Sequence, residues 1–131
     1  MSLMRNTLNL LILFLLSINC IFAQSKVFDN LKMESEILDM ERNYSIYLPP
    51  DYETSSRSYP VLYLLHGLGD DHTGWVQFGE VKKIADESII NGDATPMIIV
   101  MPDANTGYVG YINIPSENWL YEDFFFNELM P

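Results

Sequence analysis

From position 61 onward, continuous apolar runs take turns along the chain with segments whose apolar residues have helical spacing. Residues 61–65 (VLYLL) and 97–101 (MIIVM) are continuous apolar runs, which are typical of strands buried on both faces of a sheet. Residues 81–91 (VKKIADESIIN) place apolar side chains near helical spacing, and Gly92 follows as a helix stop. Residues 119–129 predict a second helix, with acids in the first turn as the helix dipole favours. Strands that alternate with helices predict an α/β fold with a mainly parallel sheet.

The residues before this unit predict a β-hairpin. Residues 32–38 alternate weakly between apolar and polar, whereas residues 44–48 (YSIYL) alternate clearly and are rich in β-forming side chains. Residues 39–43 would form the loop between them. Pro49 and Pro50 end the second strand, because proline has no N–H to donate to a ladder. We expect this hairpin to form an antiparallel N-terminal edge of the sheet.

Residues 1–23 have the pattern of a secretory signal peptide. Arg5 supplies a positive start, and residues 8–18 are an apolar run, shorter than the roughly 20 residues of a membrane-spanning helix. Cleavage after Ala23 would leave residues 24–131 as the mature chain. We therefore expect a secreted or periplasmic protein with no membrane segment after cleavage.

Cys20 is the only cysteine of the chain. A lipidated cysteine is the alternative to simple cleavage, although the asparagine before it fits lipidation motifs poorly. Cleavage after Ala23 would remove this cysteine, so the mature chain would have neither a disulfide nor a thiol nucleophile. An exported chain without disulfides is typical of a bacterial envelope or secreted enzyme.

Composition narrows the range of partners. The chain has 131 residues, of which 48% are hydrophobic, and this suits one small globular domain or a piece of a larger one. The formal net charge is −11. This balance argues against nucleic acid as a partner, because phosphate contacts need clustered Lys and Arg.

The loop after the first apolar run, residues 66–75 (HGLGDDHTGW), carries the candidate chemistry. In the simplest interpretation Gly67 and Gly69 only let the chain turn. A second interpretation is a metal site, and a third is a loop whose backbone N–H groups bind a developing negative charge. The third interpretation is favoured by the position of the loop, which follows a predicted strand, because binding and catalytic sites of open parallel sheets lie at the carboxyl ends of the strands.

The metal interpretation rests on four side chains with ligand chemistry: His66, Asp70, Asp71 and His72. The Asp-His pair resembles the end of the His-x-His-x-Asp-His motif of metallo-β-lactamase-like hydrolases. That motif would require histidines at Gly67 and Gly69, and the chain has no third histidine. We therefore expect no metal and no other cofactor.

Four segments occur in a distinctive order: YLPPDY, YPVLYLLHG, VMPD and an acidic helix that ends in ELMP. Together they resemble the esterase D and feruloyl-esterase family of α/β-hydrolases, to which mycolyltransferases are more distantly related. The resemblance extends from about Lys32 to the end of the chain. It implies an α/β-hydrolase-type sheet and serine esterase activity on small-molecule or polysaccharide acyl esters.

The resemblance also implies roles for individual positions. Leu68, the residue after His-Gly, would offer its backbone N–H to the oxyanion, and Gly67 and Gly69 would keep the loop open. Trp75 matches an aromatic residue beside this loop, where core packing and substrate contact both remain open.

Three further polar residues are expected to be structural. His66 would hydrogen-bond the loop backbone, and His72 would be a solvated loop residue rather than a base. Asp103 would end its strand as a turn former rather than take part in chemistry.

A serine esterase of this fold needs a serine in Gly-x-Ser-x-Gly, followed by an acid and a histidine. No serine of this chain has that context, and the sequence ends at Pro131. The sequence therefore predicts the N-terminal part of a secreted carboxylic-ester hydrolase, truncated before the nucleophile elbow, lacking the triad and inactive by itself. The alternative is a non-catalytic binding or scaffold protein on a partial α/β-hydrolase fold. The oligomeric state and the acyl group are left open.

Overall fold

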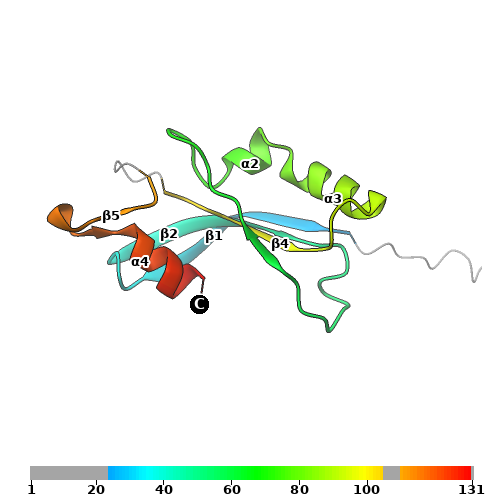
Figure 1. The fold of residues 1–131 in the computed structure, drawn as a ribbon, viewed down its shortest axis with the longest axis horizontal. Coiled ribbons are helices and arrows are strands. Elements are labelled where there is room, and N and C mark those ends of the chain that lie inside the picture. The colour runs from blue at the N-terminus through cyan, green and yellow to red at the C-terminus, as the bar shows by residue number, and fades with distance from the viewer. Residues whose placement is uncertain (1–23, 105–109, 131) are drawn as a thin grey trace, which may run out of the picture.

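The computed structural model describes residues 24–104 and 110–130. Within them, four strands form one mixed sheet in the order β1-β2-β4-β3, as Figure 1 shows. The strands are β1 (Lys26–Ser35), β2 (Met40–Leu48), β3 (Val61–Tyr63) and β4 (Ile98–Pro102). β1 pairs antiparallel with β2, and β2 pairs antiparallel with β4, whereas β3 and β4 are parallel. The predicted antiparallel N-terminal edge is confirmed, and β3–β4 is the one parallel pairing in the described part of the chain.

The hairpin turn lies earlier than predicted. Residues 36–39 form it, rather than residues 39–43, and β1 begins at Lys26. A tertiary contact explains the shift. The Glu128 carboxylate, which comes from the C-terminal helical segment, accepts the backbone N–H groups of Glu36 and Ile37 at 3.0 and 3.1 Å. The pattern of the strand alone cannot reveal a turn that is held from 91 and 92 positions away.

The helix α3 (Val81–Asn91) has the predicted bounds, and Gly92 ends it with a φ of 79°. A short helix, α2 (Gly74–Gln77), precedes it. The predicted helix over residues 119–129 begins two residues late, because Trp119–Leu120 forms a short strand, β6, that pairs with β5 (Asn113–Ile114). The remaining helical elements are a 3-10 turn, η2 (Pro115–Glu117), the helix α4 (Tyr121–Phe124) and a π-type turn, η3 (Phe125–Leu129).

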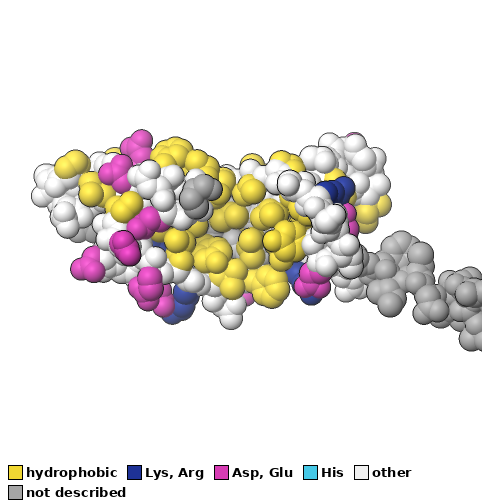
Figure 2. Space-filling model, turned by 90° about the horizontal axis from the view of Figure 1, so that it is seen from below, with side chains coloured by type: hydrophobic (Ala, Val, Ile, Leu, Met, Phe, Trp, Pro, Cys, Tyr) yellow, Lys and Arg dark blue, Asp and Glu magenta, His cyan; other side chains and the backbone are white. Residues whose placement is uncertain are grey.

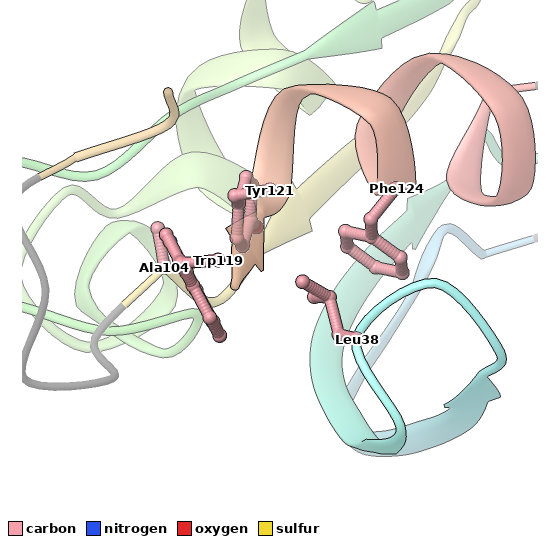
Figure 3. Packing of buried hydrophobic residues seen from close by; sticks show 5 residues of the cluster. All are labelled: Leu38, Ala104, Trp119, Tyr121 and Phe124. Atoms are coloured by element: carbon pink, nitrogen blue, oxygen red, sulfur yellow. The ribbon is translucent and has the colours of Figure 1, made fainter. Parts of the chain in front are cut away.

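Two apolar clusters hold these elements together, and α3 and α4 lie on opposite sides of the sheet (Figure 1). On the α3 side the buried residues are Tyr47, Val81, Ile99 and Met101. On the other side the buried residues are Leu38, Ala104, Trp119, Tyr121 and Phe124, drawn in Figure 3. The second cluster packs Ala104, which follows the end of β4, against residues of β6 and α4.

β3 differs from its prediction, because in the described residues it forms an open edge of the sheet. Its Val61 and Leu62 side chains are 45% and 43% exposed, so the strand is not buried on both faces. The strand order puts β4 between β2 and β3, which is why β3 and not β4 is the edge. Hydrophobic side chains also gather in the middle of the face seen in Figure 2, opposite α3. An apolar strand at an open edge offers a surface for another strand.

The predicted signal peptide, its cleavage after Ala23 and Cys20 lie outside the described residues. Residues 24–104 and 110–130 contain no helix that is long and apolar enough to cross a membrane.

Candidate active site

The chain makes a tight turn that begins at Gly67, four residues after the end of β3. The Gly67 carbonyl accepts a hydrogen bond from the Asp70 N–H at 3.2 Å, and Gly69 has a φ of 80°. Leu68 is not among the positive-φ residues, so the turn has the type II pattern, in which the third residue takes positive φ. The Leu68 side chain is 95% exposed, and its N–H donates no hydrogen bond to any described residue. An unpaired N–H therefore lies at the carboxyl end of the parallel pair.

The two aspartates after the turn bind the backbone of their own loop. Asp70 Oδ1 accepts the N–H of Asp71 at 2.9 Å. Asp71 Oδ1 accepts the hydroxyl and the N–H of Thr73 at 2.6 and 2.7 Å, and these two bonds lower the pKa of the Asp71 carboxyl. Gly74 is needed for close packing, because a Cβ there would lie 2.0 Å from Asp70 Oδ2. Both carboxylates thus shape the loop that leads into α2.

Trp75 packs against the end of β3. Its indole N–H donates to the Leu65 carbonyl at 3.0 Å, and its ring lies so close to Gly79 that a Cβ there would be 2.6 Å away. The side chain is 36% exposed and borders an apolar hollow of about 260 Å³ between β3 and α3. Packing beside the loop is therefore one role of Trp75, while contact with substrate stays a prediction.

His66 is a structural residue, as predicted. Its Nε2 accepts the N–H of Ala104 at 2.9 Å, so the ring proton lies on Nδ1, which donates to the Gly67 carbonyl at 2.8 Å. The side chain is 5% exposed. Because backbone groups occupy both ring nitrogens, His66 is not available as a catalytic base in this arrangement.

Asp103 is more than the turn former that the sequence predicts. It is buried, with Arg42 Nη2 3.7 Å from its Oδ2 and His66 Nε2 3.8 Å from its Oδ1. Its carbonyl accepts hydrogen bonds from Arg42 Nη2 and from the Tyr121 hydroxyl, the latter at 2.9 Å. Arg42 also lies 5.9 Å from the centre of the Tyr121 ring. Sequence reasoning missed Arg42 and Tyr121, since neither is near Asp103 along the chain.

The prediction that His72 is solvated is wrong. Its side chain is only 13% exposed, because the loop folds back over the end of β4. Its Nδ1 lies 3.9 Å from Asp103 Oδ2 and 4.0 Å from Asp71 Oδ1, and this atom forms no hydrogen bond with any described residue. Arg42 and Asp103, which are buried, and His66 and His72, which are partly buried, thus form one cluster, the buried polar layer, next to the loop that carries Leu68.

This polar layer lacks the geometry of two other kinds of site. In the residues that the structure describes, no group of three or more His, Cys, Asp or Glu side chains could hold a metal ion. No hydrogen bond of His66 or His72 within the same residues involves a serine. Among the described residues, the site presents a shaped turn in which the Leu68 N–H, like the N–H groups of the flanking Gly67 and Gly69, donates no hydrogen bond.

Residues 35–131 match the family model described as "Putative esterase". The chain belongs to this esterase family. It is 32% identical over 104 residues to an esterase of Mycobacterium tuberculosis, which covers 76% of this chain and 21% of that protein. It is also 37% identical over 71 residues to an endo-1,4-beta-xylanase/feruloyl esterase of Xylanibacter ruminicola, which covers 51% of this chain and 10% of that protein.

Solved esterases have the same fold. A ferulic acid esterase is 38% identical, with a TM-score of 0.77 over 83% of this chain and 41% of the solved one. An S-formylglutathione hydrolase from Agrobacterium tumefaciens, 23% identical, has a TM-score of 0.57 over 85% of this chain and 43% of that chain. These likenesses confirm the predicted α/β-hydrolase-type fold. The chain spans about a fifth of the length of the curated Mycobacterium tuberculosis esterase and about two fifths of the solved ferulic acid esterase.

Proposed function

We propose that this chain is the N-terminal part of the catalytic domain of a secreted serine carboxylic-ester hydrolase, in which the Leu68 N–H is one oxyanion donor. The observation that carries the proposal is the Gly67–Asp70 turn, which holds an unpaired N–H at the carboxyl end of β3. In α/β-hydrolases one donor of the oxyanion hole comes from the loop after the third strand, and β3 is the third strand of this chain.

The chemistry follows from where negative charge develops. Attack on an ester carbonyl converts its oxygen into an oxyanion, and a fixed N–H stabilises that charge more than it stabilises the substrate. The neighbouring carboxylates of Asp70 and Asp71 accept hydrogen bonds from loop donors. They do not bond the Leu68 N–H, which is left for the reacting oxygen.

In this proposal the nucleophile comes from residues beyond this sequence, because the sequence itself contains no Gly-x-Ser-x-Gly. The open edge of β3 is where we propose that the strand carrying the nucleophile pairs. Leu64 N–H bonds to β4, so Val61 and Tyr63, which alternate with it, direct their backbone groups to the open side. A parallel strand added there would bring its carboxyl end beside the Leu68 turn, where an elbow serine could reach the same carbonyl.

The substrate class that we propose is acyl esters of plant polysaccharides, including feruloyl esters. The support is the naming of relatives as feruloyl or ferulic acid esterases, one of them joined to a xylanase. Exposed apolar side chains of Leu68 and Trp75 beside the turn suit an apolar acyl group. The apolar run over residues 8–18 supports export, where such polymers would be met.

A fluorophosphonate probe, which labels only activated serines, tests the proposal. We define the joined enzyme as residues 24–131 followed by the part of the 38%-identical ferulic acid esterase that follows its aligned region. The 131-residue chain should show no labelling and no hydrolysis of p-nitrophenyl acetate above a denatured control. The joined enzyme should do both, with labelling confined to its elbow serine.

The second candidate function is non-catalytic binding by a partial α/β-hydrolase fold. A folded joined enzyme that is neither labelled nor active would support that alternative. Labelling of the 131-residue chain at one of its own serines would show that the active site is misplaced.

A further inference from the structure

The Tyr111 hydroxyl bonds both backbone groups of His66. It accepts the His66 N–H at 2.8 Å and donates to the His66 carbonyl at 3.1 Å. Leu64, the first residue after β3, donates its N–H to the Val100 carbonyl of β4 at 2.8 Å, and the alternation of an extended chain would turn the backbone groups of His66 to the same side. β4 ends at Pro102, and the tyrosine hydroxyl takes the place of the missing ladder partner.

We infer that Tyr111 is a positioning residue that, through His66, aims the Leu68 N–H at the oxyanion. This inference rests on the proposed function. The Gly67 carbonyl and the Leu68 N–H belong to one planar trans peptide, in which they point in opposite directions. The His66 ring donates to that carbonyl at 2.8 Å, and the Asp70 N–H donates to it at 3.2 Å. Whatever holds the carbonyl therefore also sets the direction of the N–H.

Tyr111 is itself held firmly enough to do this. Its ring packs edge-on against Tyr121, with centroids 5.5 Å apart at 80°, and lies 5.5 Å from the His66 ring. Tyr121 is fully buried and hydrogen-bonds the Asp103 carbonyl at 2.9 Å. Burial raises the pKa of Tyr111 to about 12, so its hydroxyl keeps the proton that it donates to His66. The tyrosine thus links the end of β3 to the buried polar layer.

Substitution Tyr111→Phe in the joined enzyme tests the inference, because it removes only the hydroxyl. We expect faster amide hydrogen exchange in peptides that cover residues 64–70. We also expect kcat for p-nitrophenyl acetate to fall about tenfold to a hundredfold with little change in KM, since a misplaced donor acts on the transition state. Tyr47→Phe is the matched control. It also removes a buried tyrosine hydroxyl, bonded at 2.9 Å to Asp86 on the α3 side of the sheet, and it should leave kcat unchanged.

Two results would overturn the positioning role. One is unchanged exchange of residues 64–70 in Tyr111→Phe, and the other is a kcat no lower than that of Tyr47→Phe. Failure of the proposed function would look different: the unaltered joined enzyme would not react with the fluorophosphonate probe. The exchange measurement would still decide whether Tyr111 holds the loop, because it does not depend on catalysis.

Discussion

Gly67 and Gly69 flank Leu68, and the structure predicts opposite results when each is replaced by alanine. A Cβ at either position would meet no described atom within 4 Å, so sterics of the surroundings do not distinguish them. Their backbones do, because Gly69 has a φ of 80° and Gly67 is not among the positive-φ glycines. An L-residue in the left-handed region costs about 1–2 kcal/mol relative to glycine.

The unfolded state contributes equally to both variants. Alanine restricts the unfolded chain and stabilises by about 0.4–1 kcal/mol wherever the native conformation is compatible. Gly67→Ala should therefore raise the free energy of unfolding by about that amount. The same contribution cancels in the comparison, so Gly69→Ala should be less stable than Gly67→Ala by about 1–2 kcal/mol.

Urea unfolding of the joined enzyme, followed by circular dichroism, measures this difference. Gly69→Asn provides a graded control, because asparagine tolerates the left-handed region better than alanine and should fall between the other two variants. Equal stabilities of Gly67→Ala and Gly69→Ala would refute the type II turn, and with it the direction of the Leu68 N–H that this turn sets.

Three further predictions concern the donor, the open edge and the buried tyrosine. Leu68→Pro, which removes the N–H, should cost about 2.7–4 kcal/mol of transition-state stabilisation in the joined enzyme, whereas Leu68→Ala should keep most activity. Proline is favoured at the second position of a type II turn, so the turn itself should persist. Equal kcat values for the proline variant and the wild type would exclude the donor role. Residues 24–131 alone should be poorly soluble or molten, and Val61→Lys at the open edge should raise the soluble fraction; a sharp cooperative thermal transition of the unaltered piece would contradict this. Because the pKa of Tyr111 is raised from its ordinary value of 10.0 to about 12, this tyrosine contributes stability that is complete below pH 10 and is lost as the pH rises toward about 12. In urea unfolding over that pH interval, Tyr111→Phe should therefore lose less free energy of unfolding than the unaltered protein. Identical losses in the two proteins would be evidence against the raised pKa.

Local patterns predicted the elements whose causes are local. The helix over residues 81–91 follows from apolar spacing and from Gly92, which takes the positive φ that glycine accepts without a steric cost. The apolar runs of β3 and β4 can be recognised directly in the sequence, and so can the glycine turn between β3 and α2. The structural role of His66 was also predictable, because a histidine at a strand end next to a glycine loop has backbone groups within reach.

Contacts between distant residues could not be predicted in this way. Burial of Asp103 depends on Arg42 and Tyr121, which are 61 and 18 positions away. Tyr111 is 45 positions from His66, in a stretch of sequence that reads as a loop. The spacing of these residues along the sequence does not predict that the Tyr111 hydroxyl bonds both backbone groups of His66.

The sequence by itself determined the α/β order of elements, the family and the turn that carries the candidate donor. These depend on periodicity, on glycine's backbone freedom and on short motifs, all of which act over a few residues. Only the tertiary structure decided that β3 is the open edge, that Asp103 is buried and His72 partly buried, and that Tyr111 holds His66. Those features depend on strand order and on side chains brought together by folding, so their physical cause is the packing of the sheet rather than any local preference of the chain.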